Sequence, residues 1–316
     1  MNWSDNGNRR GTDGMPEGMF PPPEQAPSSP SRPWVHILLL LATGVTTTLA
    51  MGFLFSVTLL TILGIHEFGH YFASRYWGVK ATLPYFIPAP FAFGTMGAVI
   101  KIKSPIPNRN ALIDIGAAGP IAGFVAAIIA LCVGLSLSEV KATEAGGAGI
   151  FLGDSLLSSL LAHLIVGRTA PGTDIFLHPI AFAGWLGLFI TVLNLLPIGQ
   201  LDGGHIVYAM FERQHAVIAN ATTAALLLLT VAGPPYAWMT TLRTPGLQVA
   251  TLFKVWLEGR WYGWVFFVFI IRVFLGVRHP PLIEAERPLD PSRKRIGYVS
   301  LAIFVLCFIP VPFIGL

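Results

Sequence analysis

Residues 53–77 read FLFSVTLLTILGIHEFGHYFASRYW, an apolar run that carries two histidines and a glutamate near its end. On a helix of about 3.6 residues per turn, His66 and His70 point to the same side because they are four residues apart. Two imidazoles in this arrangement suit one zinc ion, with Glu67 beside them as general base. Such residues are costly inside an apolar helix, which favours a functional role over chance. The run therefore predicts a transmembrane helix with a zinc-dependent hydrolytic site.

The whole chain has the composition of a membrane protein. Of its 316 residues, 53% are hydrophobic and 11% are charged, and the mean hydropathy is +0.66, whereas about a quarter of the residues of soluble proteins are charged. We therefore expect an all-α polytopic membrane protein in contact with the lipid bilayer. The net charge of +4 does not indicate a nucleic-acid partner, because basic residues of membrane proteins gather in their cytoplasmic loops. The oligomeric state is left open.

Apolar segments of suitable length predict about seven transmembrane helices. A single helix over 34–77 would extend about 66 Å, roughly twice the hydrocarbon thickness, so this stretch predicts two spans that turn near Met51 and Gly52. The other five spans are expected at residues 111–136, 178–197, 216–232, 261–277 and 297–314. Small residues such as Gly116, Gly119 and Gly123 predict close helix packing in the third span.

The segments outside the spans differ in character. Residues 1–33, rich in Pro, Gly and Ser, predict a disordered cytoplasmic tail, which leaves 34–316 as the transmembrane domain. Within the proline- and glycine-rich stretch 79–110, residues 95–103 partly alternate and predict a small β-hairpin or strand-like membrane-associated loop. Residues 137–175 predict a glycine-rich polar loop with a short amphipathic helix near 156–166.

Basic residues indicate the orientation of the chain. With seven spans and a cytoplasmic N-terminus, three clusters fall on the cytoplasmic side, as the positive-inside rule requires. The clusters are Arg9, Arg10 and Arg32; Arg75, Lys80, Lys101, Lys103 and Arg109; and Arg278, Arg287, Arg293, Lys294 and Arg295. Arg243, Lys254 and Arg260 depart from this pattern. The histidine pair then lies in the cytoplasmic half of the second span.

Asp202 is the best candidate for the third zinc ligand that a hydrolytic site needs. It belongs to the stretch NLLPIGQLDGGH at residues 194–205, at the cytoplasmic end of the fourth span. The second span ends on the same side, so Asp202 and His66 are expected at similar depth. The alternative is that Asp202 is only a turn residue before glycine.

Two motifs together resemble the site-2 protease family of intramembrane metalloproteases. The family's His-Glu-x-x-His helix is matched by His66–His70, and its Asn-x-x-Pro-x-x-x-x-Asp-Gly motif by Asn194–Gly203. The stretch from about Gly94 to Gly123 also looks like the family's core, so the resemblance covers roughly residues 52–215, the expected catalytic core. Many bacterial members carry an inserted PDZ domain, and this chain is similar to a member without one.

The resemblance implies an intramembrane zinc endopeptidase that cleaves transmembrane segments of other membrane proteins. It implies one zinc ion per chain held by His66, His70 and Asp202, with Glu67 activating the water. The expected location is a bacterial or archaeal cell membrane, with the active site toward the cytoplasm.

Substrate contacts are expected from the Asn194 motif and from the strand-like loop. Asn194 is suited to hydrogen-bond the substrate backbone or the oxyanion; alternatively its amide satisfies a helix end. The strand could receive an unwound substrate by edge pairing, or be a plain interfacial hairpin. The strand residues named for substrate binding are Thr95, Gly97, Val99 and Lys101.

Two other classes of protein remain open. A metal transporter would use intramembrane His and Asp as a translocation site, but it would need further ionisable residues within the spans, and these are few. A catalytically inactive scaffold would be expected to lack Glu67, which is present.

Overall fold

The structure, a computed structural model, describes residues 33–91, 93–142, 151–232, 261–276, 282–284 and 287–314. The predicted tail at 1–33 lies outside the described residues except for Pro33. The helices are α1 (Pro33–Met51), α2 (Phe53–Tyr76), α3 (Arg109–Ser136), α4 (Leu156–Ile165), α5 (Pro179–Leu195), α6 (Asp202–Phe211), the 3-10 turn η1 (Glu212–Gln214), α7 (His215–Ala232), α10 (Gly263–Ile270), the π-helical η2 (Ile271–Leu275) and α11 (Pro291–Cys307). The strands are β1 (Tyr85–Pro88), β2 (Thr95–Val99), β3 (Glu139–Ala142), β4 (Phe151–Leu152), β5 (Thr173–Phe176) and β6 (Phe313–Ile314).

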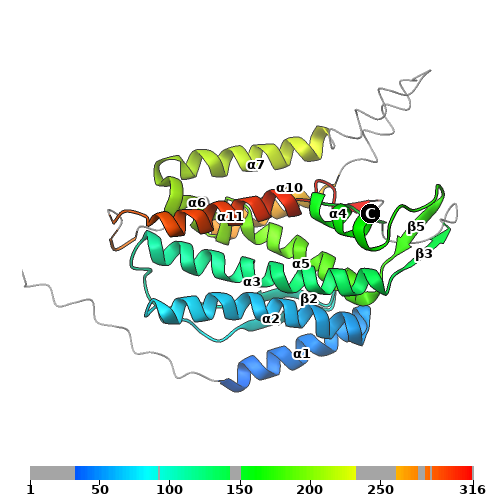
Figure 1. Cartoon of the computed structure of the whole chain (residues 1–316). Helices are drawn as coiled ribbons and strands as arrows, with labels where there is room; N and C mark the ends of the chain where they lie inside the picture. Colours follow the sequence, from blue (N-terminus) through cyan, green and yellow to red (C-terminus); the bar gives the residue numbers. More distant parts are fainter. Residues whose placement is uncertain are drawn as a thin grey trace, which may run out of the picture. The chain divides into compact units, whose positions relative to one another are not determined.

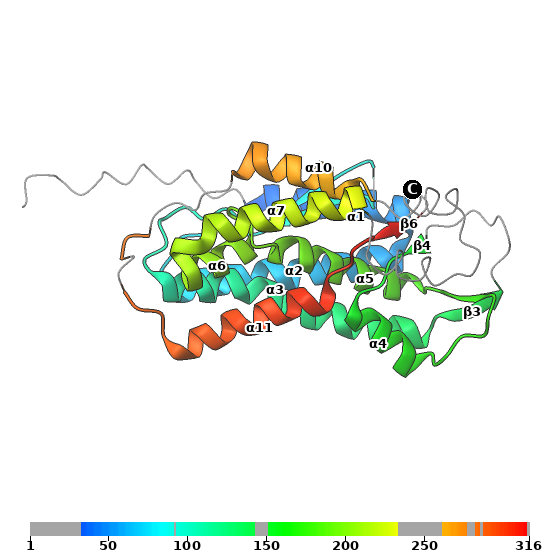
Figure 2. The same ribbon diagram turned by 90° about the horizontal axis from the view of Figure 1, so that it is seen from above.

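Three neighbouring helices, α2, α3 and α5, form the centre of the bundle (Figures 1 and 2). Small residues let them approach closely. A Cβ atom on Gly69 of α2 would lie 2.6 Å from the carbonyl oxygen of Ala118 in α3, and one on Gly134 of α3 would lie 2.0 Å from the backbone nitrogen of Ala181 in α5. The close packing predicted for the third span is therefore confirmed.

Among the residues that the structure describes, four helical stretches are long and apolar enough to cross a membrane: Pro33–Met51, Phe53–Tyr76, Arg109–Ser136 and Asp202–Val231. The turn predicted near Met51 and Gly52 is confirmed, since α1 ends at Met51 and Gly52, at φ 90°, precedes α2. The expected count of seven spans is not confirmed. At the fourth and sixth predicted spans the apolar helices, Pro179–Leu195 and Gly263–Phe274, are shorter.

The seventh predicted span, 297–314, needs correction. The helix covers Pro291–Cys307 instead, because Pro310 and Pro312 cannot continue it. The chain beyond it is extended, and Phe313–Ile314 pairs antiparallel with Phe151–Leu152.

A β-hairpin follows α2, as predicted. β1 and β2 pair antiparallel, with a bulge between Phe86 and Pro88, and β1 packs against α1. The strand is shorter than the predicted 95–103, since β2 ends at Val99. Lys101 lies beyond it, where its backbone amide donates to Oγ1 of Thr82 over 2.9 Å.

The loop expected at 137–175 holds more regular structure than its composition indicated. The predicted short helix is present as α4, and its N-terminus is capped by a reciprocal pair of hydrogen bonds between Ser155 and Ser158. In addition, β3 and β5 form an antiparallel pair that the sequence did not predict.

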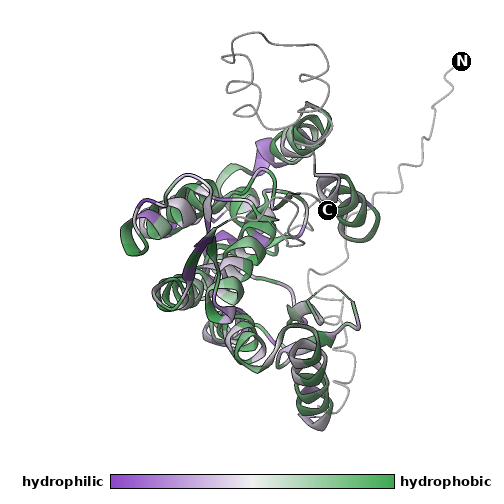
Figure 3. Ribbon diagram, turned by 90° about the vertical axis from the view of Figure 1, so that its right-hand side faces the viewer, coloured by the Kyte–Doolittle hydropathy of each residue, from purple (hydrophilic) through white to green (hydrophobic). Residues whose placement is uncertain are grey.

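Hydrophobic residues make up much of the helical bundle (Figure 3), and many large ones are exposed at its surface. On α1 the side chains of Leu41 and Leu49 are 62% and 82% exposed. Large exposed apolar surfaces of this kind are rare on soluble monomers, and they fit contact with lipid.

Candidate metal centre

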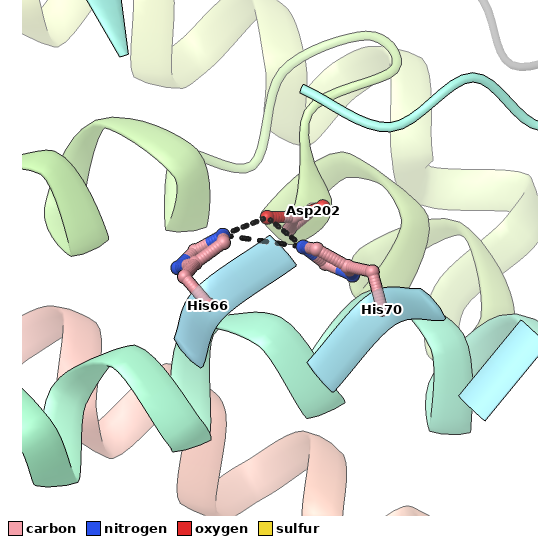
Figure 4. Close-up of side chains that lie close together, drawn as sticks. All are labelled: His66, His70 and Asp202. Atoms are coloured by element: carbon pink, nitrogen blue, oxygen red, sulfur yellow. Dashed lines mark hydrogen bonds and ion pairs between the residues drawn. The ribbon is translucent and has the colours of Figure 1, made fainter. Parts of the chain in front are cut away.

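His66 and His70 lie on the same buried face of α2 and direct their Nε2 atoms toward one point (Figure 4). The two Nε2 atoms are 3.2 Å apart. Asp202 comes to the same point from the first turn of α6, with Oδ2 at 3.5 Å from Nε2 of His66 and 3.2 Å from Nε2 of His70. The structure thus brings together three residues that the sequence predicted as a group.

These separations fit a tetrahedral metal ion. Zinc bonds to nitrogen and oxygen of 2.0–2.1 Å place neighbouring tetrahedral ligands about 3.4 Å apart. Among the residues that the structure describes, His66, His70 and Asp202 form the one cluster of this type that could hold a metal ion. A set of three protein ligands, two His and one acidic residue, leaves the fourth position of a tetrahedral ion open for water.

The tautomer of His70 suits metal binding. Its Nδ1 lies 2.7 Å from the backbone oxygen of Ile115 in α3, which can only accept a hydrogen bond. Nδ1 therefore carries a proton, and Nε2 is the ring nitrogen that faces the Asp202 carboxylate. In its neutral form, His70 would offer the lone pair of this Nε2 to a metal ion shared with the carboxylate.

The loop before α6 fixes the position of Asp202. Gly203 and Gly204 allow α6 to begin directly against the end of α5, since a Cβ on Gly203 would lie 1.9 Å from the oxygen of Leu195. Behind this loop, the buried side chain of His215 at the start of α7 hydrogen-bonds the backbone of Gly199. In the Asp-Gly-Gly sequence, the aspartate supplies the acidic group and the two glycines allow the close packing that positions it.

Two glycines of α3 make room for the histidines, a role that the sequence analysis missed. A Cβ on Gly119 would lie 2.1 Å from Nε2 of His70, and a Cβ on Gly123 would lie 2.8 Å from Nδ1 of His66. In the sequence, the four-residue spacing of Gly119 and Gly123 indicated only close helix packing. Nothing in the sequence says which groups fill the space.

Glu67 and Asn194 both lie at this centre. Glu67 is 6% exposed, follows His66 directly on α2 and lies close to the backbone of Ile100, just past the end of β2. The amide Nδ2 of Asn194, near the end of α5, is 3.2 Å from Nε2 of His66. A glutamate and an amide thus lie beside the three potential ligands.

The strand residues named for substrate binding lie on or just beyond β2, beside α2. Thr95 is buried and its Oγ1 donates to the oxygen of Ile87 over 3.0 Å and accepts from the amide of Gly97 over 3.0 Å. Val99 is exposed, and a Cβ on Gly97 would meet no atom within 4 Å. In the described part of the chain, β2 is paired with β1 on one edge only.

Helices suited to a membrane, with a buried His-His-Asp cluster and a neighbouring glutamate, define the class of membrane-embedded metallopeptidases. Residues 54–232 match the model of Peptidase family M50. The chain belongs to this family, the site-2 proteases, and the resemblance seen in the two motifs is confirmed.

Similar proteins are found in plants. The chain is 38% identical over 187 residues to the probable zinc metalloprotease EGY1, chloroplastic, of Arabidopsis thaliana, covering 56% of this chain and 33% of that protein. It is 28% identical over 255 residues to the probable zinc metalloprotease EGY2, chloroplastic, of the same plant, covering 80% and 40%. EGY1 of Oryza sativa subsp. japonica is 37% identical over 181 residues, covering 56% and 31%. The matches thus span about a third to two fifths of these relatives.

Proposed function

We propose that this chain is an intramembrane zinc endopeptidase that hydrolyses peptide bonds in transmembrane segments of other membrane proteins. The convergence of His66, His70 and Asp202 within 3.2–3.5 Å, beside Glu67 and inside apolar helices, carries the proposal. Membership of Peptidase family M50 and relatives named as zinc metalloproteases support it.

The three clustered side chains would hold one zinc ion per chain. When bound, zinc lowers the pKa of a water ligand to about 7 and polarises a carbonyl group. Glu67 accepts the proton of the attacking water and delivers it to the leaving amide nitrogen. The Ile115 carbonyl keeps His70 in the ligating tautomer through the 2.7 Å contact with Nδ1.

Asn194 is proposed to orient the substrate. Nε2 of His66 has one lone pair, so it cannot bind a metal and accept a hydrogen bond from Asn194 at the same time. With the metal bound, the Asn194 amide is available to donate to the substrate backbone or to the oxyanion.

The substrate segment would unwind and pair with β2. A helical segment hides its peptide bonds, whereas an extended one can add to a strand edge. The paired substrate would then lie next to the metal centre. It would contact Thr95, Gly97 and Val99 on β2, and Lys101 beyond it. Support comes from the contact between α2 and β2 and from the closeness of Glu67 to the backbone of Ile100, which follows β2 directly.

The proposed orientation places the metal centre toward the cytoplasmic side of a bacterial or archaeal membrane. Arg75 is in the last turn of α2, close to His70, and Arg109 begins α3. Basic residues at this end support a cytoplasmic location by the positive-inside rule. The named relatives are chloroplastic.

A reporter carrying one transmembrane segment tests the proposal. We expect the purified wild-type protein in proteoliposomes to cleave it, and Glu67→Gln to reduce the rate by at least about a hundredfold, the lower range for loss of a general base. Glu139→Gln, an exposed position on β3, is the matched control and should cleave like wild type.

Two outcomes contradict the proposal. Equal cleavage by wild type and Glu67→Gln would remove the protease assignment. Zinc flux across the same vesicles that survives Glu67→Gln, without cleavage, would favour a transporter instead.

A further inference from the structure

An aromatic cluster surrounds Phe313 near the beginning of α2, away from the basic end of that helix. The rings of Phe93 and Phe313 are stacked at 5.7 Å, and Trp185 meets Phe313 edge-on at 5.4 Å. Phe182 lies 5.6 Å from Phe93. We call these four side chains the Phe313 cluster. They join three segments that are far apart in the sequence: the β1–β2 turn, α5 and β6.

The segment that carries Phe313 is held in place along its length. The indole of Trp264 donates to the oxygen of Pro310 over 2.8 Å, and the amide of Gly153 donates to the oxygen of Pro312 over 2.9 Å. A Cβ on Gly153 would lie 1.9 Å from the oxygen of Val311, so the two backbones are in direct contact. Phe313 itself is 8% exposed. The position of Phe313 is therefore fixed by its neighbours, and Phe93 packs against it.

Phe93 belongs to the turn between β1 and β2, and α1 holds the next residue of that turn. Oγ1 of Thr46 donates to the oxygen of Gly94 over 2.6 Å. A Cβ on Gly94, at φ 84°, would lie 2.5 Å from Cα of Thr47. The turn is thus fixed on one side by α1 and on the other by the Phe313 cluster.

The other end of the hairpin reaches the metal centre. β2 starts at Thr95, directly after the turn, and contacts α2; the backbone of Ile100, one residue past the end of β2, lies close to Glu67. A strand rises about 3.3 Å per residue, and a shift of one residue turns every side chain to the opposite face. A change at the turn would therefore move the whole strand relative to Glu67.

We propose that Phe93 and Phe313 act as a register clamp: their contact fixes where β2 lies relative to the metal centre and so selects the peptide bond that is cleaved. This inference rests on the proposed function, in which the substrate pairs with β2. Phe93 and Phe313 are positioning residues, since neither contacts the metal-centre residues. The clamp acts through the strand alone.

Mapping of the cleavage site tests the clamp. We expect Phe313→Ala and Phe93→Ala to produce fragments cut at more than one neighbouring bond, detected by mass spectrometry of the reporter products. Because a misplacement of about 1 Å can cost about a hundredfold in rate, we expect kcat/KM to fall at least about tenfold while zinc content stays at the wild-type level. The effects of the two substitutions should be less than additive in the double variant, since both remove the contact between Phe93 and Phe313.

Phe269→Ala is the matched control, because this phenylalanine of α10 is 59% exposed and outside the cluster. It should retain the wild-type cut and rate. Phe313→Leu and Phe93→Leu replace the alanine variants if these do not fold, and they should also shift the cut. Wild-type cutting at the wild-type rate by zinc-loaded Phe93 and Phe313 variants would overturn the clamp while leaving the protease assignment intact. Retained cleavage in Glu67→Gln would overturn the assignment itself.

Discussion

Single glycines decide whether the histidines of α2 can face the metal centre. Gly119 and Gly123 lie one helical turn apart on α3, each directly against one imidazole ring. The absence of a side chain at both positions lets α3 pack so closely that the Ile115 carbonyl reaches Nδ1 of His70. The four-residue spacing of these glycines therefore allows both the close packing of α3 on α2 and the position of the two histidines.

We predict that Gly119→Ala abolishes zinc binding at the centre. The added Cβ would lie 2.1 Å from Nε2 of His70, so the ring must leave its position. Loss of supporting contacts around a metal site costs about 10- to 100-fold in affinity, and displacement of the ligand itself should cost at least that much. Zinc content of the purified variant, measured by atomic emission, tests this.

Gly44→Ala on α1 provides the control. A Cβ there would meet the side chain of Leu60 at an ordinary 3.8 Å, and alanine favours a helix by about 0.8–1.0 kcal/mol relative to glycine. This variant should bind zinc normally and be slightly more stable. Full zinc content in Gly119→Ala would contradict the packing argument.

At the scale of the elements, a polar network joins α2, α3 and α11 beside the metal centre. Nε of Arg293 in α11 and the indole Nε1 of Trp77 both donate to Oδ2 of Asp114 in α3, each over 2.9 Å. Arg293 also lies over the Trp77 ring at 5.1 Å. Asp114 directly precedes Ile115, whose carbonyl holds His70. The network thus fixes the turn of α3 that supports the proposed ligand.

A double-mutant cycle on Asp114→Asn and Arg293→Gln should show coupling. Both side chains are about one fifth exposed, so solvent weakens the pair, and we expect an interaction energy of about 0.5–3 kcal/mol in the free energy of unfolding. Denaturation of the detergent-solubilised protein measures it. Strictly additive effects of the two substitutions would show that the helices are held by other contacts.

The whole molecule combines an apolar exterior with a buried polar centre. In the described part of the chain, four helical stretches are long enough to cross a bilayer, and the centre lies between α2, α3 and α6. A metal ion bound by His66, His70 and Asp202 would link α2 to α6, and binding to such a preformed site adds to the stability of the fold. The proposed zinc ion should therefore stabilise the entire bundle.

We predict that a chelator lowers the thermal unfolding temperature. A ligand that binds only the folded state adds about 4 kcal/mol when its free concentration is a thousand times its Kd, which corresponds to roughly 10 °C for a chain of this size. Differential scanning fluorimetry with and without zinc measures the shift. His70→Ala should show no effect of the chelator, and an equal shift in that variant would place the metal elsewhere.

The sequence by itself determined the membrane class, the turn at Gly52, the hairpin after α2 and the grouping of the histidine pair with Asp202. These follow from composition, from the spacing of residues within one helix and from local turn residues, all of which are properties of short segments. The proposed roles of Glu67 and Asn194 also came from the sequence, and they stay predictions.

Only the tertiary structure decided which distant segments meet. The pairing of β4 with β6, the contact of Asp114 with Arg293 and the fit of Gly119 against His70 depend on how whole helices pack. Periodicity tells which face of a helix is apolar or small, but not which partner covers that face. For the same reason the span count of seven could not be confirmed: the ends of α5 and α11 depend on prolines and packing as well as on hydropathy.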